Sequence, residues 1–206
     1  MRRLVIDTAT PACSVALFDN GKLVAGEYQE LGRGHAERLI PLIKDLPENG
    51  CADAIHVNVG PGSFTGVRVG ISAARALALA WGIECYGYGC MQLVAAMAVG
   101  GQSPSPPVDA AMHGGHGEYF FQSFGEAGLP VTEAQSLAPE DAAKISAAPV
   151  IAGSVANELA GLRGSAKAMQ LLPDARQWHL IADSKPIPVS ALYIREADAK
   201  LPEKRA

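Results

Sequence analysis

The sequence predicts an α/β protein with a mixed β-sheet, divided into two units. Three observations predict it. The chain opens with three apolar segments joined by short turns, helical and strand-like segments then alternate, and a glycine- and proline-rich segment interrupts the chain at residues 100–107 (GGQSPSPP). We place the boundary inside that segment, which gives units at 1–101 and 102–206.

The first unit opens with a predicted three-stranded meander at residues 4–6, 13–18 and 23–28. Asp19-Asn20-Gly21 lies between the second and third segments, and this composition supplies the positive φ angles that a tight hairpin needs.

Hydrophobic periodicity and residues that end helices predict the remaining elements. Residues 35–46 place Leu39, Leu42, Ile43 and Leu46 on one helical stripe, and Gly82 ends a longer helix that begins near residue 65. We expect helices at 35–46, 65–81, 91–99 and 155–162, and strands at 54–59, 84–88, 108–112, 118–124 and 149–152.

Composition excludes several classes of protein. Of 206 residues, 49% are hydrophobic and 18% charged, which is typical of a globular chain and not of a disordered one. A net charge of −4 argues against binding nucleic acid without a basic partner. The four cysteines lack CxxC spacing, and no segment resembles a signal peptide or a membrane span. We therefore expect a soluble cytoplasmic protein that does not bind membranes.

The loop Gly60-Pro61-Gly62-Ser63 joins a strand to a helix. Its backbone N–H groups and the helix dipole are suited to an anion, although no Gly-Lys-Ser/Thr follows as in a P-loop. The alternative is a plain turn in which Ser63 or Thr65 caps the helix, and the residues alone favour this plain turn.

The helix after this loop carries small residues every four positions, at Gly66, Gly70, Ala74 and Ala78. Such a ridge allows another helix to approach closely, or it packs on the protein's own sheet. Arg68, Ser72 and Arg75 lie on another side, either as a solvated face or as the polar rim of a contact.

Candidate catalytic groups are sparse. Asp7-Thr8-Ala9-Thr10 resembles the first phosphate loop of the actin, sugar kinase and Hsp70 superfamily, but a strand-ending Asp-Thr is also common in plain turns. His35 lacks a second histidine at i+4, and the pair His113 and His116 lacks a completing ligand, so we expect no metal site. No Gly-x-Ser-x-Gly motif is present, and no catalytic residue is predicted.

Five segments taken in order resemble one family. They are VIDTAT, CSVALF, GRGHAERLIPLI, GPGSFTGVRVGISAARALALAWGI and ALYIREADAK. Together they are similar to the bacterial TsaB (YeaZ) family, which is needed for the threonylcarbamoyladenosine (t6A) modification of tRNA. The resemblance is dense over the first hundred residues and patchy beyond them. It implies an actin-like ASKHA (ribonuclease H-like) fold of two subdomains with mixed sheets, the second of them reduced.

The resemblance also implies a role. Family members are non-catalytic scaffold paralogues that activate the metal-binding TsaD through the helices that match residues 35–46 and 63–81 here. They form homodimers when alone, TsaE joins as a third component, and tRNA is reached only through the complex. The residues expected at this interface are His35, Arg38, Leu39, Leu42, Gly66, Arg68, Gly70, Ile71, Ser72, Ala74, Arg75 and Ala78.

No cofactor is expected on this chain alone, but in the family a nucleotide (ATP or ADP) can lie near the junction with TsaD. The residues expected near it are Asp7, Thr8, Gly60, Gly62 and Ser63. One departure is the turn His113–Tyr119, which replaces the family's usual Asp-Ala-Arg segment. The alternative function is a stand-alone ASKHA-type ATPase or kinase, or a metallopeptidase-like enzyme.

Overall fold

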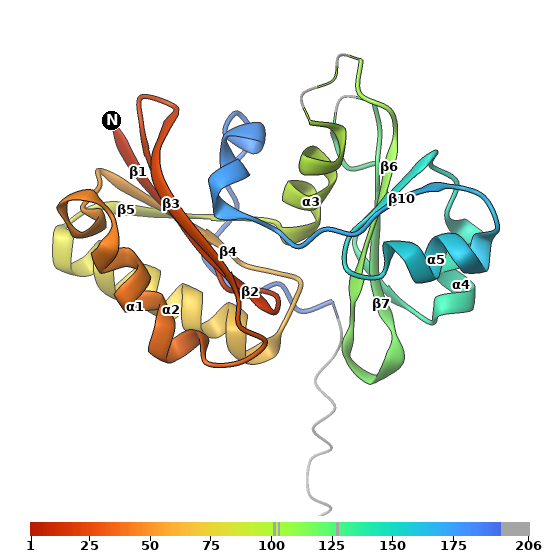
Figure 1. The fold of residues 1–206 in the computed structure, drawn as a ribbon, viewed down its shortest axis with the longest axis horizontal. Helices are drawn as coiled ribbons and strands as arrows, with labels where there is room; N and C mark the ends of the chain where they lie inside the picture. The colour runs from red at the N-terminus through yellow and green to blue at the C-terminus, as the bar shows by residue number, and fades with distance from the viewer. Residues whose placement is uncertain (101, 103, 127, 195–206) are drawn as a thin grey trace, which may run out of the picture.

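The computed structural model describes residues 1–100, 102, 104–126 and 128–194. It contains two five-stranded mixed sheets, in the orders β3-β2-β1-β4-β5 and β10-β9-β6-β7-β8, which stand side by side with helices on their faces (Figure 1). The predicted α/β class and the two mixed sheets are confirmed. Within the described residues, no helix is both long enough and apolar enough to cross a membrane.

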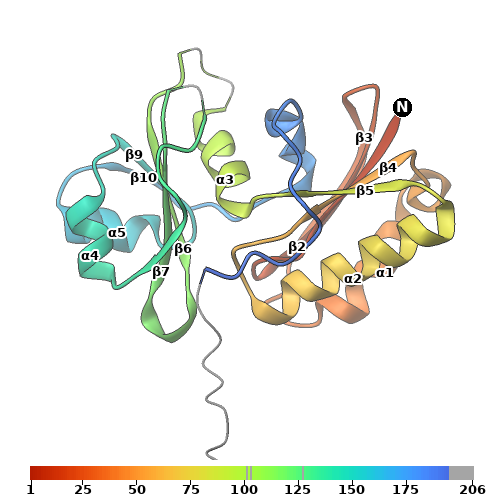
Figure 2. The ribbon, with the colours of Figure 1, turned by 180° about the vertical axis from the view of Figure 1, so that it is seen from behind.

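The first sheet begins with the predicted meander. Strands β1 (Arg2–Asp7), β2 (Ala12–Asp19) and β3 (Lys22–Glu30) are antiparallel, and β4 (Ala54–Asn58) and β5 (Glu84–Tyr88) add parallel strands beside β1. Asn20 and Gly21 have φ angles of 48° and 79°, as the hairpin requires. Helices α1 (His35–Asp45) and α2 (Phe64–Trp81) cover one face of this sheet, and the 3₁₀ turn η1 (Pro47–Gly50) follows α1 (Figures 1 and 2).

The second sheet contains β6 (Val108–His113), β7 (Tyr119–Phe124), β8 (Gln135–Leu137), β9 (Val150–Ala152) and β10 (Lys167–Met169). Helices α4 (Pro139–Ile145) and α5 (Ala156–Arg163) pack on one face, and α3 (Cys90–Val99) packs on the other. The short turn η2 (Gly115–Gly117) joins β6 to β7. The three-residue strands β8 and β10 were not predicted, because so short a segment shows no alternation.

Helix α3 and the end of the chain join the two sheets. One side of α3 packs on the second sheet, and Leu93 on its other side contacts the back face of the first sheet. The 3₁₀ helix η3 (Ala175–Ile181) then covers that back face with Trp178 and Ile181. The chain continues along β5, where Ile187 pairs with Gly87.

The division at residue 101 is therefore wrong for the end of the chain. Residues 175–192 pack on the first sheet and belong to it structurally. We call residues 186–194 the C-terminal strap.

The small-residue ridge of α2 faces the protein's own sheet. Gly66, Gly70, Ala74 and Ala78 are all buried. A Cβ on Gly66 would lie 2.1 Å from the carbonyl oxygen of Thr8, and one on Gly70 would lie 2.5 Å from Thr8 Oγ1. The prediction that this ridge forms a docking face is wrong, because Thr8 at the end of β1, together with Ile6 of β1 and Val57 of β4, already packs against it.

Four further residues predicted at the interface are also internal. Leu39, Leu42 and Ile71 belong to the core between the sheet and its two helices. His35 is buried, and its Nε2 lies 2.9 Å from the carbonyl oxygen of Thr10 and 3.2 Å from that of Ala12. His35 thus fixes the start of α1 to the β1–β2 turn.

We predict that Gly66→Ala destabilises the protein by about 1–3 kcal/mol, despite alanine's higher helix propensity, because the methyl group would overlap Thr8. Urea denaturation measures the effect. Ser72→Ala on the exposed side of α2 is the matched control, with an expected change within about 0.5 kcal/mol. Equal stability of Gly66→Ala and the wild type would contradict this account of the contact.

Candidate functional site

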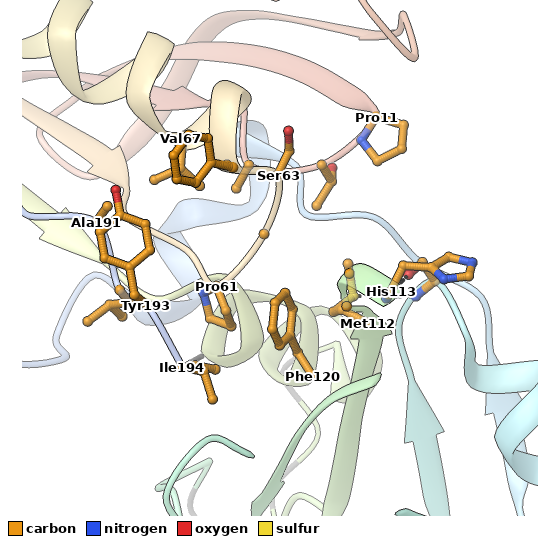
Figure 3. A pocket seen from close by; sticks show the side chains of 18 of the residues that line it. Pro11, Pro61, Ser63, Val67, Met112, His113, Phe120, Ala191, Tyr193 and Ile194 are labelled. Carbon is orange, nitrogen blue, oxygen red and sulfur yellow. Dashed lines mark hydrogen bonds between the residues drawn. The ribbon is translucent and has the colours of Figure 1, made fainter. Parts of the chain in front are cut away.

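A pocket of about 750 Å³ lies between the two subdomains, and we call it the interdomain pocket (Figure 3). One side consists of the β1–β2 turn, the loop before α2 and the first turns of α2. The other side consists of the end of β6, the β6–β7 turn, Phe120 and Ser154. Residues 191–194 of the C-terminal strap complete the wall.

The interdomain pocket is mainly apolar and carries little charge. Figure 3 shows Pro61, Met112, Phe120 and Ile194 around its centre. Among the described residues that line it, there is no aspartate, glutamate or lysine, and Arg68 provides the permanent positive charge. His113 and His116 lie at the β6–β7 turn. The walls therefore favour an apolar ligand body, and Arg68 favours an anionic group.

Asp7 lies beneath the pocket wall and is fully buried. Its Oδ2 accepts hydrogen bonds from Asn58 Nδ2 (2.7 Å) and the Tyr88 hydroxyl (2.9 Å), and its Oδ1 accepts one from the Ala9 N–H (3.2 Å). Burial raises the pKa of the Asp7 carboxyl to about 7, although these three hydrogen bonds act in the opposite direction. The carboxylate is thus a structural link between β1, β4 and β5.

Asp7, Thr8 and Gly60 do not line the interdomain pocket, and the prediction that they lie near a nucleotide at the junction with TsaD stays a prediction. Thr8 Oγ1 donates to the carbonyl oxygen of Gly66 at 2.7 Å, and the Gly60 N–H donates to Asn58 Oδ1 at 2.8 Å. Gly62 and Ser63, in contrast, do line the pocket.

The loop before α2 is a capped turn. Ser63 Oγ accepts from the Gly66 N–H at 3.2 Å, and the Ser63 N–H donates to the carbonyl oxygen of Ala9 at 2.7 Å. A Cβ on Gly62 would lie 2.1 Å from that same oxygen, so a glycine here allows the loop before α2 to lie close to the β1–β2 turn. The geometry supports the plain turn over a phosphate cradle.

A second concavity of about 480 Å³ lies on the outer side of the two helices, and we call it the α1–α2 groove. Its described lining is Ala36, Leu39, Ile40, Phe64, Thr65, Arg68, Val69, Ser72 and Ala73. Ile40 is 44% exposed and Phe64 63% exposed, and Leu79 further along α2 is 86% exposed. Large apolar side chains on a helical face are a common mark of an interface.

Four of the predicted interface residues, Arg38, Arg68, Ser72 and Arg75, are on the surface. The Arg68 guanidinium lies 3.3 Å from the centre of the Phe64 ring and 5.5 Å from that of Tyr193. Arg75 Nη2 donates to the carbonyl oxygen of Val189 at 2.5 Å, so Arg75 anchors the C-terminal strap.

Sequence reasoning missed Ile40, Phe64 and Tyr193. Ile40 follows Leu39 and lies off the buried stripe of α1, and this is the signal that would have found it.

The described residues contain no candidate metal centre, and two of the cysteines are deeply buried. No group of three or more histidine, cysteine, aspartate or glutamate side chains in them is arranged to hold a metal ion. Burial raises the pKa of the Cys13 thiol to about 11 and that of Cys90 further still, which leaves both thiols protonated and unreactive at neutral pH.

Comparisons with known proteins agree on one family. A family model described as TsaD, tRNA N6-adenosine threonylcarbamoyltransferase, matches residues 29–173. The tRNA threonylcarbamoyladenosine biosynthesis protein TsaB of Escherichia coli is 44% identical over 84 residues, which is 38% of this chain. That match spans only 36% of the length of the E. coli protein.

Two further matches cover nearly the whole chain. An uncharacterized protein of Mycobacterium tuberculosis is 33% identical over 207 residues, covering 96% of this chain and 93% of its own length. The structure of YeaZ from Pseudomonas aeruginosa superimposes with a TM-score of 0.77 and 27% identity, over 93% of this chain and 99% of that one. With the two mixed sheets described above, these matches show that this chain belongs to the TsaB (YeaZ) family and has its actin-like α/β (ASKHA-type) fold.

Proposed function

We propose that this chain takes part in t6A biosynthesis as a non-catalytic subunit, which activates a TsaD-type transferase by docking through the outer face of α1 and α2. The observation that carries the proposal is the α1–α2 groove with exposed Ile40 and Phe64 at its edge. Relatives whose names connect them to t6A biosynthesis support the pathway.

The outer face has the composition of a contact surface. The lining of the groove is mainly apolar, and Thr65, Arg68 and Ser72 supply its polar groups. Arg38 is exposed on α1 but donates to Gln29 on β3 and does not line the groove. Interfaces of this kind combine a desolvated apolar centre with a polar rim in which arginine is favoured. The same face would support the homodimer of the chain alone, because a self-complementary patch can bind either a second copy or a paralogue.

The remaining parts of the assembly rest on the resemblance to the family. We propose that TsaE joins the complex, that a nucleotide lies at the junction with TsaD, and that tRNA is reached only through the assembled complex in the cytoplasm. The acidic net charge of −4 supports a chain that does not hold tRNA alone.

The contacts of Asp7 and His35 support the non-catalytic role, because an enzyme of this fold would need these side chains to be accessible. The Asp7 carboxylate is sealed by Asn58, Tyr88 and the Ala9 N–H, and so it has no route to a metal-bound water. His35 Nε2 lies within hydrogen-bond distance of two backbone carbonyls, and among the described residues no group of three or more metal-ligating side chains includes it. These contacts argue against both the ATPase and the metallopeptidase alternatives.

We predict that Ile40→Arg and Ser72→Arg each weaken binding to the TsaD of the same organism by at least about tenfold, because each places a charge in the groove. Isothermal titration calorimetry with the purified proteins measures this. Leu162→Arg is the matched control: Leu162 is also exposed but lies on α5 of the second sheet, and binding should not change. If both groove variants bind TsaD with wild-type affinity, the interface does not lie in the α1–α2 groove.

We predict that the purified chain alone neither hydrolyses ATP nor binds stoichiometric zinc or iron. Phosphate release and elemental analysis after metal loading measure the two properties. If the wild type hydrolyses ATP and Asp7→Asn does not, or if the wild type binds metal and His113→Ala does not, the chain is an enzyme and not a scaffold.

A third prediction concerns pH. The folded state holds the Asp7 proton more tightly than the unfolded chain, since the pKa is about 7 in the fold against 3.8 for the unperturbed group. Asp7 therefore contributes a fall in folded-state stability as pH rises from about 5 to 7, by at most about 1.4 kcal/mol per pH unit. His56 contributes in the opposite direction below about pH 6.5, because burial lowers its pKa to about 4.

Urea denaturation across this pH range measures the slope. Asp7→Asn should remove the falling contribution, so that its stability rises with pH relative to the wild type. Asp183→Asn, which alters an exposed carboxylate, should keep the wild-type slope. The same slope in Asp7→Asn and wild type would show that another group causes the pH dependence.

A further inference from the structure

We propose that the interdomain pocket binds a small organic monoanion with an aromatic or otherwise apolar body, whose anionic group lies at Arg68. The interdomain pocket shares Phe64 and Arg68 with the α1–α2 groove, but the inference does not depend on the proposed function.

The size and lining of the pocket support the apolar body. A volume of about 750 Å³ lies within the range of about 300–1,000 Å³ that is typical of small-molecule sites. Pro61, Met112, Phe120 and Ile194 surround the centre, and both subdomains contribute to it (Figure 3). A flat or branched apolar group would be enclosed from several sides there, which is where burial of apolar surface is most favourable.

The charges around the pocket support a single anionic group. Arg68 is the permanently charged residue among the described lining, and no carboxylate there opposes an anion. The guanidinium lies against the Phe64 ring, 3.3 Å from its centre, and 5.5 Å from the centre of the adjacent Tyr193 ring. These rings restrict the guanidinium before any ligand arrives, so less conformational entropy is lost when it pairs with a carboxylate or sulfonate.

The backbone of the β1–β2 turn and of the β6–β7 turn does not favour a chain of phosphates. In the β1–β2 turn, the Ala9 N–H is bound to Asp7, the Ala12 N–H is bound to Thr10 Oγ1, and Pro11 has no N–H. Across the pocket, the His113 N–H is bound to Ser154 Oγ and the Gly114 N–H to the carbonyl oxygen of Glu118. A triphosphate needs several free donors, whereas one carboxylate or sulfonate is served by Arg68 alone.

The test uses two fluorescent probes that differ by one charge. 1-Anilinonaphthalene-8-sulfonate has an aromatic body with one sulfonate, and N-phenyl-1-naphthylamine has the same body without it. We expect the purified wild-type chain to bind one molecule of either probe, with Kd measured by fluorescence titration.

Arg68→Gln should weaken binding of the sulfonate probe by about fivefold and leave binding of the neutral probe unchanged, because only the ion pair is lost. Ala191→Trp should weaken both probes, because the indole occupies part of the pocket, and circular dichroism checks that this variant folds. Leu79→Ser removes an exposed apolar side chain outside the pocket and serves as the control, with no change expected for either probe.

Competition separates the ligand classes. Indole-3-acetate, an aromatic monocarboxylate, should displace the sulfonate probe, and ATP at the same concentration should not. Displacement by ATP alone would replace the proposal by a nucleotide site. If Arg68→Gln weakens the binding of both probes equally, the anionic group does not lie at Arg68. If neither Arg68→Gln nor Ala191→Trp changes the Kd of either probe, the probes do not bind in the interdomain pocket.

Discussion

The contact between Thr8, which directly follows β1, and the glycines of α2 is the constraint on which the rest of the structure depends. The Thr8 hydroxyl donates to the carbonyl oxygen of Gly66, and the lack of side chains at Gly66 and Gly70 allows the helix to lie directly on the strand. Because the first turn of α2 is fixed there, Ser63 reaches the carbonyl oxygen of Ala9 and the loop closes against the β1–β2 turn. One wall of the interdomain pocket and the outer helical face are both consequences of this contact.

The sequence predicted the local elements well because the signals for them are local. Asp19-Asn20-Gly21 predicted a hairpin because few residue types adopt positive φ, and Gly82 marked the end of α2 for the same reason. The direction of the small-residue ridge was not predictable in this way. A row of glycine and alanine fits a partner helix and the chain's own strand equally well, and only the position of Thr8 decides between them.

The candidate site was predicted less completely, because it depends on segments far apart in the chain. The strap brings Leu192 to β4, where its N–H donates to the carbonyl oxygen of Val59 at 2.8 Å, and it places Tyr193 beside Arg68. The proline-containing tail shows no periodicity that would predict its packing against the first sheet. Asp7 stood out in the sequence for its position at the end of a strand, but the roles of Asn58 and Tyr88 as its partners follow from the sheet order alone.

Arg68 connects the two surfaces of the first subdomain. It lines both the α1–α2 groove and the interdomain pocket, and its ring contacts link α2 to the C-terminal strap. A ligand that draws the guanidinium toward the pocket and a partner that contacts it from the groove therefore act on one side chain. Coupling between two binding events is reciprocal, so a ligand that strengthens docking must itself be bound more tightly by the docked chain. Any coupling between the two proposed sites would pass through Arg68, because this side chain lines both concavities.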